Sequence, residues 1–188
     1  RLAGSDRYET AYAVAEQMKL NKGKEKFDNI VVASGENYPD ALSGNYLAFR
    51  KKAPMLLTNQ YEVDNTAEYI KNSIEPNGTV YILGQTSAVP ASLEQKLQGI
   101  NVKRIGGSDR FETNLLILKE ARVHGEELIV CSGLNFPDAV SASAANRPIL
   151  LADDKLSASQ KNYLSTIDPL KVYFIGGDKA VPKEVRDE

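Results

Sequence analysis

The sequence alternates between short apolar runs and longer amphipathic segments. Residues 29–34 (NIVVAS), 54–58 (PMLLT) and 79–84 (TVYILG) are dense in Val, Ile and Leu. Runs of this length and composition are typical of strands that are buried on both faces of a parallel sheet. The pattern therefore predicts a strand at each of these positions.

Helix-length segments lie between the predicted strands. In residues 5–18, apolar side chains recur at helical spacing and polar side chains occupy the opposite face. Strands and helices that alternate in this way need right-handed crossover connections, which build layered α/β structures. We expect a Rossmann-like or flavodoxin-like α/β fold, with mainly parallel sheets flanked by helices.

The same phrases occur twice along the chain, in the same order. RLAGSDRYET begins at Arg1 and RIGGSDRFET begins at Arg104. Three further pairs follow: VVASGENYPDAL and IVCSGLNFPDAV, PMLL and PILL, and VYILGQTSAVP and VYFIGGDKAVP. Because similarity that extends through a whole chain indicates a duplicated structural unit, we divide the chain into two tandem modules, residues 1–103 and 104–188.

In each copy the sequence pattern predicts about four units of one strand and one helix. The second copy stops inside the helix that matches residues 91–97, and Arg1 lies where a linking strand would end. We therefore expect the chain to be part of a longer tandem array.

The composition narrows the classes of function. Hydrophobic residues make up 42% of the 188 residues and charged residues 26%, which is typical of a folded protein. The formal net charge of −2 does not supply the basic field that nonspecific nucleic-acid binding needs. No apolar stretch approaches the roughly 20 residues that cross a bilayer. We expect no nucleic-acid partner and no membrane span.

Catalytic and metal motifs are missing from the sequence. Cys131 and His124 are single residues of their types, which excludes an internal disulfide and any metal site with several cysteines. Ser34 and Ser132 lie in strand-to-helix turns, but neither has the G-x-S-x-G of a nucleophile elbow. The repeated phrase also lacks the G-x-G-x-x-G of dinucleotide-binding folds. We expect no catalysis, no metal and no cofactor.

The repeated phrase GSDRYET has the pattern of a helix start. Asp6 can cap the first backbone amides while Glu9 reaches back, as in a capping box. Arg7 does not fit this pattern, because a cation in the first turn opposes the helix dipole. Two interpretations stay open: a salt bridge to Asp40 or the neighbouring copy, or an anion held between Arg7 or Arg110 and free helix amides.

A second strand-to-helix turn, SGENYPDAL or SGLNFPDAV, repeats this logic. The Asn can cap the helix, the Pro suits the first turn and the Asp complements the dipole. Because open α/β sheets bind ligands outside the C-terminal ends of their strands, the same side chains are also candidates for ligand contact. These candidates are Ser34, Asn37, Asp40, Ser132, Asn135 and Asp138.

The PMLL and PILL segments are expected to be buried strand in part. If the copies pack together, the exposed ends of these strands can line an interface or the wall of a groove. The candidates in these segments are Pro54, Leu56, Leu57, Pro148, Leu150 and Leu151.

The combination of RIGGSDRFET, CSGLNFPDAVSAS, RPILL and VYFIGGDKAVP resembles the type 2 cell-wall-binding repeat of clostridial and other Gram-positive surface proteins, among them S-layer proteins and autolysins. Both copies carry the resemblance along their whole length. It implies extracellular modules, usually three around a pseudo-threefold axis, that bind an anionic, teichoic-acid-like secondary polymer of the cell wall. Enzymatic activity would belong to a separate domain.

The resemblance also implies roles for particular residues. Arg7 and Arg110 would be polymer contacts, and the PMLL and PILL segments would lie near the binding groove. The chain has two copies where the family usually has three, so a groove formed between modules would be incomplete.

Two other classes of function stay open. A small-molecule or nucleotide-binding α/β protein would have one dominant pocket whose residues occur in one copy. A structural assembly module would use its arginines to join copy to copy. A wall-anchoring module would instead carry its contacts at equivalent places in each copy.

Overall fold

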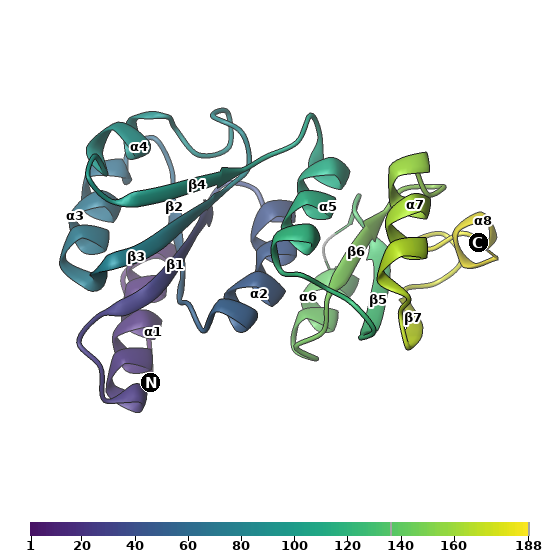
Figure 1. The fold of residues 1–188 in the computed structure, drawn as a ribbon, viewed down its shortest axis with the longest axis horizontal. Helices are drawn as coiled ribbons and strands as arrows, with labels where there is room; N and C mark the ends of the chain where they lie inside the picture. The colour runs from purple at the N-terminus through teal and green to yellow at the C-terminus, as the bar shows by residue number, and fades with distance from the viewer. Residues whose placement is uncertain (136, 188) are drawn as a thin grey trace.

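A computed structural model describes residues 1–135 and 137–187. Within them, helices and strands alternate as the apolar pattern predicts (Figure 1). The first elements are α1 (Arg7–Lys22), β1 (Phe27–Ser34), α2 (Pro39–Lys51), β2 (Met55–Thr58), α3 (Val63–Ser73), β3 (Ile74–Leu83), α4 (Ser92–Lys96) and β4 (Asn101–Ile105). They are followed by α5 (Arg110–Glu120), β5 (Glu127–Ser132), α6 (Pro137–Ser143), β6 (Ile149–Ala152), α7 (Ala158–Ile167), β7 (Lys171–Ile175) and α8 (Lys183–Arg186).

Within the residues that the structure describes, the strands form two parallel sheets. The first has the order β2-β1-β3-β4 and the second has the order β6-β5-β7. In each sheet the first strand lies between the second and the third, which is the strand order of flavodoxin-like sheets. The predicted class, α/β with parallel sheets flanked by helices, is confirmed.

The first sheet separates two apolar layers. On one face, Ile30 and Val32 of β1 pack with residues of α1, α3 and α4. On the other face, Val31 and Ala33 of the same strand pack with α2. Because successive side chains of a strand point to opposite faces, a continuous apolar run fills both layers.

Helices α2 and α5 lie between the two sheets and join the copies (Figure 1). Leu47 of α2, Leu118 of α5, Val31 of β1 and Leu150 of β6 belong to one apolar cluster, and all four side chains are fully buried. One side of α5 therefore packs on α2, and the other packs on the second sheet. The two copies share this core.

Strand β4 lies at the junction between the copies. It pairs in parallel with β3, and Arg104 lies opposite Ile82. The predicted division between residues 103 and 104 falls inside this strand. The last strand of the first sheet thus ends in the first two residues of the phrase that opens the second copy.

Asn114 is a buried polar residue at the interface between the copies. Its side chain is 0% exposed, and Nδ2 donates hydrogen bonds to the carbonyl of Ile149 at 2.8 Å and to Ser43 Oγ at 3.1 Å. Its Oδ1 accepts a hydrogen bond from the backbone N–H of Leu151 at 3.0 Å. The corresponding residue of the first copy is Ala11. Asn114 therefore links the edge strand β6 to α2 by a contact that the first copy lacks.

Charged side chains also act across the interface. Arg50 of α2 forms an ion pair with Glu126 at 2.5 Å. Asp40 lies in the first turn of α2, near Arg110 at the start of α5. Burial raises the pKa of Asp40 above its ordinary value of 3.8, and the positive charge of Arg110 offsets part of this rise. Arg7, the counterpart of Arg110, is not among the groups that shift it.

We predict that Asn114→Ala lowers the free energy of unfolding by about 3 kcal/mol, because a buried N–H and a buried carbonyl lose their partners. Urea denaturation measures the change. The matched variant Asn65→Ala, at an exposed position of α3, should change the same quantity by less than about 0.5 kcal/mol. Equal effects of the two variants would contradict the role given to Asn114.

We predict that Arg110→Gln raises the pKa of Asp40 further, because burial remains and the opposing positive charge is removed. A carboxyl group whose pKa is higher in the folded state than in the unfolded state stabilises the fold at low pH. That contribution is lost as the pH rises through the folded pKa. NMR titration of the Asp40 carboxyl carbon measures the shift. Arg7→Gln is the control, and an equal shift in both variants would show that Arg110 has no specific effect.

Candidate functional site

The helix starts predicted at the two repeated phrases are confirmed. Asp6 is the N-cap of α1, and its Oδ1 accepts hydrogen bonds from the backbone N–H groups of Tyr8 at 2.8 Å and Glu9 at 2.9 Å. Asp109 caps α5 in the same way. These carboxylates satisfy amide donors that have no partner within the helix. The amides are therefore already occupied in both copies.

A glutamate completes each helix start. Glu9 Oε2 accepts hydrogen bonds from the backbone N–H of Ser5 at 2.8 Å and from its hydroxyl at 2.7 Å. Glu112 and Ser108 form the same two bonds, both at 2.6 Å. These bonds hold the pKa of both glutamates below its ordinary value. Because two carboxylates surround each helix start, an anion would have to be held by the arginine and not by the amides alone.

Arg7 and Arg110 brace the turn that follows the first strand of their own copy. Nη1 of Arg7 donates a hydrogen bond to the carbonyl of Gly35 at 2.6 Å, and Nη1 of Arg110 donates to Gly133 at 2.8 Å. Within the part of the chain that the structure describes, neither arginine forms a salt bridge. A guanidinium has five N–H donors. Each arginine therefore has donors beyond the one bonded to glycine, at the C-terminal edge of its sheet.

Two serine candidates are buried in these same turns. Ser34 and Ser132 are each 4% exposed. Their hydroxyl oxygens accept hydrogen bonds from the backbone N–H groups of Glu36 at 3.2 Å and Leu134 at 3.1 Å. Both serines therefore shape the turn.

The two asparagine candidates, Asn37 and Asn135, are exposed. The capping role predicted for Asn37 is wrong, because Tyr38 occupies the N-cap position of α2 and no side chain bonds the first amides. Instead, Asn37 Oδ1 accepts a hydrogen bond from the adjacent backbone N–H of Tyr38 at 3.1 Å. Tyr38 already has helical backbone angles, so Asn37 lies one residue too early to cap. Pro39 begins the helix, as predicted.

Asp40 and Asp138 lie against the glycine loops that follow β3 and β7. Gly84 has a φ of 92° and Gly176 a φ of 128°, a region that favours glycine. A Cβ atom at Gly84 would lie 2.4 Å from Asp40 Oδ2, and one at Gly176 would lie 2.9 Å from Asp138 Oδ2. The two carboxylates therefore pack on the backbone at the C-terminal edge of each sheet.

The PMLL and PILL segments are buried strand, as expected in part. Among the candidates in these segments, Leu57 is half-buried, and it lines a shallow depression together with Arg7. The other five candidates are buried: Pro54, Leu56, Pro148, Leu150 and Leu151.

The C-terminal ends of β1, β2 and β3 surround a pocket of about 600 Å³, which we call the Tyr61 pocket. Glu36 and Asn37 line it from the loop after β1, residues 59–61 from the loop after β2, and Thr86 and Ser87 from the loop after β3. Open α/β sheets bind their ligands at this edge. The Tyr61 pocket is therefore the candidate ligand site of the first copy.

Three side chains form a hydrogen-bond network beside the Tyr61 pocket. The hydroxyl of Tyr8 donates to Glu36 Oε1 at 2.6 Å, and Asn59 Nδ2 donates to both of these oxygens at 2.8 Å. Burial and the bond to Glu36 raise the pKa of Tyr8 to about 12. The donors of Asn59 and Tyr8 hold the pKa of Glu36 below its ordinary value. Glu36 is thus a carboxylate held at a defined position.

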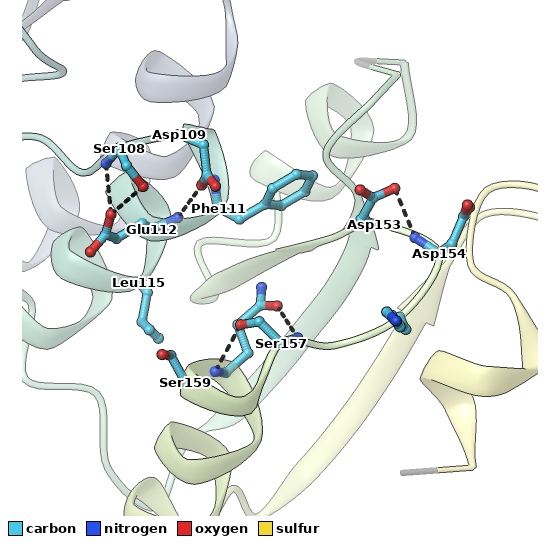
Figure 2. A pocket seen from close by; sticks show the side chains of 11 residues that line it. Ser108, Asp109, Phe111, Glu112, Leu115, Asp153, Asp154, Ser157 and Ser159 are labelled. Carbon is cyan, nitrogen blue, oxygen red and sulfur yellow. Dashed lines mark hydrogen bonds between the residues drawn. The ribbon is translucent and has the colours of Figure 1, made fainter.

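The second copy has a different pocket, of about 530 Å³ (Figure 2). It lies between the start of α5, with Asp109 and Glu112, and the loop after β6, with Asp153 and Asp154. The ring of Phe111 points from α5 toward the Asp153 side. Four carboxylates and one lysine line this pocket, so its charge does not favour an anionic ligand.

The sequence interpretation missed Tyr8, Glu36 and Asn59, because it selected residues that recur in both copies. Glu36 corresponds to Leu134 in the second copy. Differences at equivalent positions are the signal that would have found this network.

Other chemistry can be assessed within residues 1–135 and 137–187. In these ranges, no group of three or more His, Cys, Asp or Glu side chains is arranged to hold a metal ion. No helix there has the length and apolar character needed to cross a bilayer. Cys131 is buried, and burial raises the pKa of its thiol to about 12, which does not favour a reactive thiolate.

Both copies match one family. A sequence profile of Cell wall binding domain 2 (CWB2) matches residues 1–94 and 104–186. Two proteins of Bacillus subtilis (strain 168) are similar. N-acetylmuramoyl-L-alanine amidase LytC is 32% identical over 142 residues, or 74% of this chain and 27% of the relative. Amidase enhancer is 27% identical over 193 residues, or 100% of this chain and 25% of the relative. The chain thus spans about a quarter of each relative.

Solved structures from Clostridium difficile share the fold. Cwp6 superimposes with a TM-score of 0.86 at 29% identity, over 99% of this chain and 30% of that chain. Cwp8 superimposes with a TM-score of 0.80 at 29% identity, over 99% of this chain and 32% of that chain. These matches place the chain at the cell wall on the bacterial surface. The chain therefore belongs to the Cell wall binding domain 2 family, and each of its two copies is a binding module of that family.

Proposed function

We propose that this chain is a noncatalytic module that anchors a surface protein to the Gram-positive cell wall by binding an anionic secondary polymer. The observation that carries the proposal is the equivalent placement of Arg7 and Arg110 at the C-terminal edges of the two sheets. Each side chain is held by a glycine carbonyl and has further N–H donors. A planar guanidinium suits the oxygens of phosphate and carboxylate groups.

The surroundings of Arg7 support binding of a charged group. Arg7 shares a shallow depression of about 350 Å³ with Asn37, Tyr38, Ala41 and Leu57, and Glu36 is the one carboxylate among the residues that line it. Charge interactions are stronger beside apolar walls than in open water. We therefore propose Asn37 and Leu57 as flanking contacts in the first copy, and Asn135 as the corresponding contact in the second.

The buried candidates have a different role in this proposal. They lie in the strands and turns that form the C-terminal edge of each sheet, where the arginines are placed. These residues are Ser34, Ser132, Pro54, Leu56, Pro148, Leu150 and Leu151, together with Asp40 and Asp138 at the glycine loops.

We further propose that additional copies of the repeat pack on this chain, in a pseudo-threefold arrangement. Helix α5 covers the α2 side of the first sheet. On the corresponding side of the second sheet, Val140 of α6 is 49% exposed, whereas its counterpart Leu42 packs against the core. Tyr173 is half-buried, whereas its counterpart Tyr81 is 6% exposed. This surface fits the first helix of another copy. Binding at several copies would then gain affinity by avidity.

The pockets give less support to a small-molecule or nucleotide-binding protein. Such a protein would have one dominant pocket, but each copy has a pocket, and the two are of similar volume. This chain matches 27% of the length of the amidase LytC. We assign the amidase activity in that protein's name to the part of it that lies outside the match.

We predict that Arg7→Ala and Arg110→Ala each weaken binding to isolated walls about tenfold or more, because a hydrogen-bonded charge pair is lost. Cosedimentation with wall sacculi measures the binding. The control Arg122→Ala removes the same charge from the turn that leads into β5, at the opposite edge of the sheet, and should bind like the unchanged protein.

Sacculi stripped of their secondary polymers should bind none of these proteins. Thermal unfolding followed by circular dichroism confirms that each variant is folded, since Arg7 and Arg110 also brace a turn. Equal binding to stripped and intact sacculi would contradict the polymer as the ligand. Equal binding by the Arg7, Arg110 and Arg122 variants would contradict the arginine contacts.

A further inference from the structure

The Tyr61 pocket differs in its chemistry from the arginine site beside it. Its lining includes the side-chain amides of Asn37 and Gln60 and the hydroxyls of Thr86 and Ser87. These groups both donate and accept hydrogen bonds, as the hydroxyl groups of a sugar do. One carboxylate, on Glu36, also lines it. The pocket therefore suits a ligand that is rich in hydroxyl groups and carries no negative charge.

Tyr61 gives this pocket an exposed aromatic surface. Its side chain is 80% exposed, although large apolar rings are usually covered. Asn59 holds the loop that carries it, because Asn59 Oδ1 accepts hydrogen bonds from the backbone N–H groups of Tyr61 at 2.8 Å and Glu62 at 2.9 Å. Asn59 Nδ2 is bonded to Glu36 at the same time. The aromatic ring and the carboxylate are thus held by one residue.

The second copy shows that this lining is not required by the fold. Tyr61 corresponds to Lys155, and Asn59 and Gln60 correspond to Asp153 and Asp154 (Figure 2). The second copy therefore has charged groups in place of the amides and the ring. It serves as a control within the same molecule.

The Tyr61 pocket adjoins the depression around Arg7. Ser34, Glu36 and Asn37 line both of them. A chain of sugars with anionic groups could place a sugar ring in the pocket and its charged group at Arg7.

We propose that the Tyr61 pocket binds a neutral pyranose ring of the wall polymer. The C–H face of the ring packs on Tyr61, and its hydroxyl groups bond to Glu36 and Gln60. This inference rests on the proposed function, and it adds the saccharide class and the copy that recognises it. Arg7 holds the anionic group, and the Tyr61 pocket distinguishes one sugar from another.

The test uses NMR spectroscopy of the ¹⁵N-labelled chain. It is titrated separately with the methyl pyranosides of glucose, galactose, mannose, rhamnose, N-acetylglucosamine and N-acetylmannosamine. Single sugars in open pockets bind with dissociation constants on the order of millimolar, so each is titrated through that range. At least one sugar should give saturable shifts at the amides of residues 59–61 and 86–87.

Three variants separate this proposal from a general surface effect. Tyr61→Ala should weaken the binding about tenfold, because the aromatic contact is lost, and Tyr61→Phe should retain it. Lys155→Ala changes the equivalent position of the second copy and should have no effect. The exposure of Tyr61 means that its loss leaves the fold intact, which the dispersion of the spectrum confirms.

Several results would overturn the proposal. The first is that no sugar gives saturable shifts at these amides, and the second is that Tyr61→Ala binds as tightly as the unchanged chain. Tighter binding of adenosine than of every sugar would show a nucleobase site instead. Wall cosedimentation of the unchanged chain keeps the two proposals apart. Full wall binding without sugar binding rejects the pyranose pocket alone, whereas sugar binding without wall binding rejects the anchoring function.

Discussion

The burial of α5 between two sheets is the constraint on which the rest of the structure depends. Parallel sheets need an apolar layer on both faces. Helix α2 lies on one face of the first sheet, and α5 completes that layer while it also covers the second sheet through Leu118. Because one helix serves both sheets, packing sets the orientation of the copies. Asn114 adds directional bonds to this contact, since its amide links β6 to Ser43 of α2.

This shared core holds the C-terminal edges of both sheets in fixed positions. The arginines there brace the turns of their own copies, and in the proposed function they also hold the anionic groups of the polymer. One Nη atom of Arg7 or Arg110 braces the turn after the first strand, and a guanidinium has further N–H donors besides this one. The proposed anion would depend on the arginine, because Asp6 and Glu9 already occupy the amides of the helix start. A chain of nearly neutral charge can in this way present positive charge locally.

Duplication has kept the framework and changed the pockets. The caps, the arginine braces and the glycine loops recur in both copies with the same bonds. The linings of the pockets do not recur: the first copy has amides, hydroxyl groups and the exposed ring of Tyr61, and the second has Asp153 and Asp154. If the proposed function holds, identical frameworks with different linings suit a polymer whose successive groups differ in charge. Each copy can then contact a different part of the same chain.

The sequence by itself determined the α/β class, the parallel strands, both helix starts and the burial of PMLL and PILL. These follow from local periodicity, from capping between residues a few positions apart, and from repetition. Only the tertiary structure decided that β4 joins the first sheet, that Asn37 does not cap α2, and that Arg7 bonds a glycine carbonyl. It alone brought Tyr8, Glu36 and Asn59 together. The physical reason is that these contacts join loops from separate strands, and their distances depend on how the helices pack against the sheets.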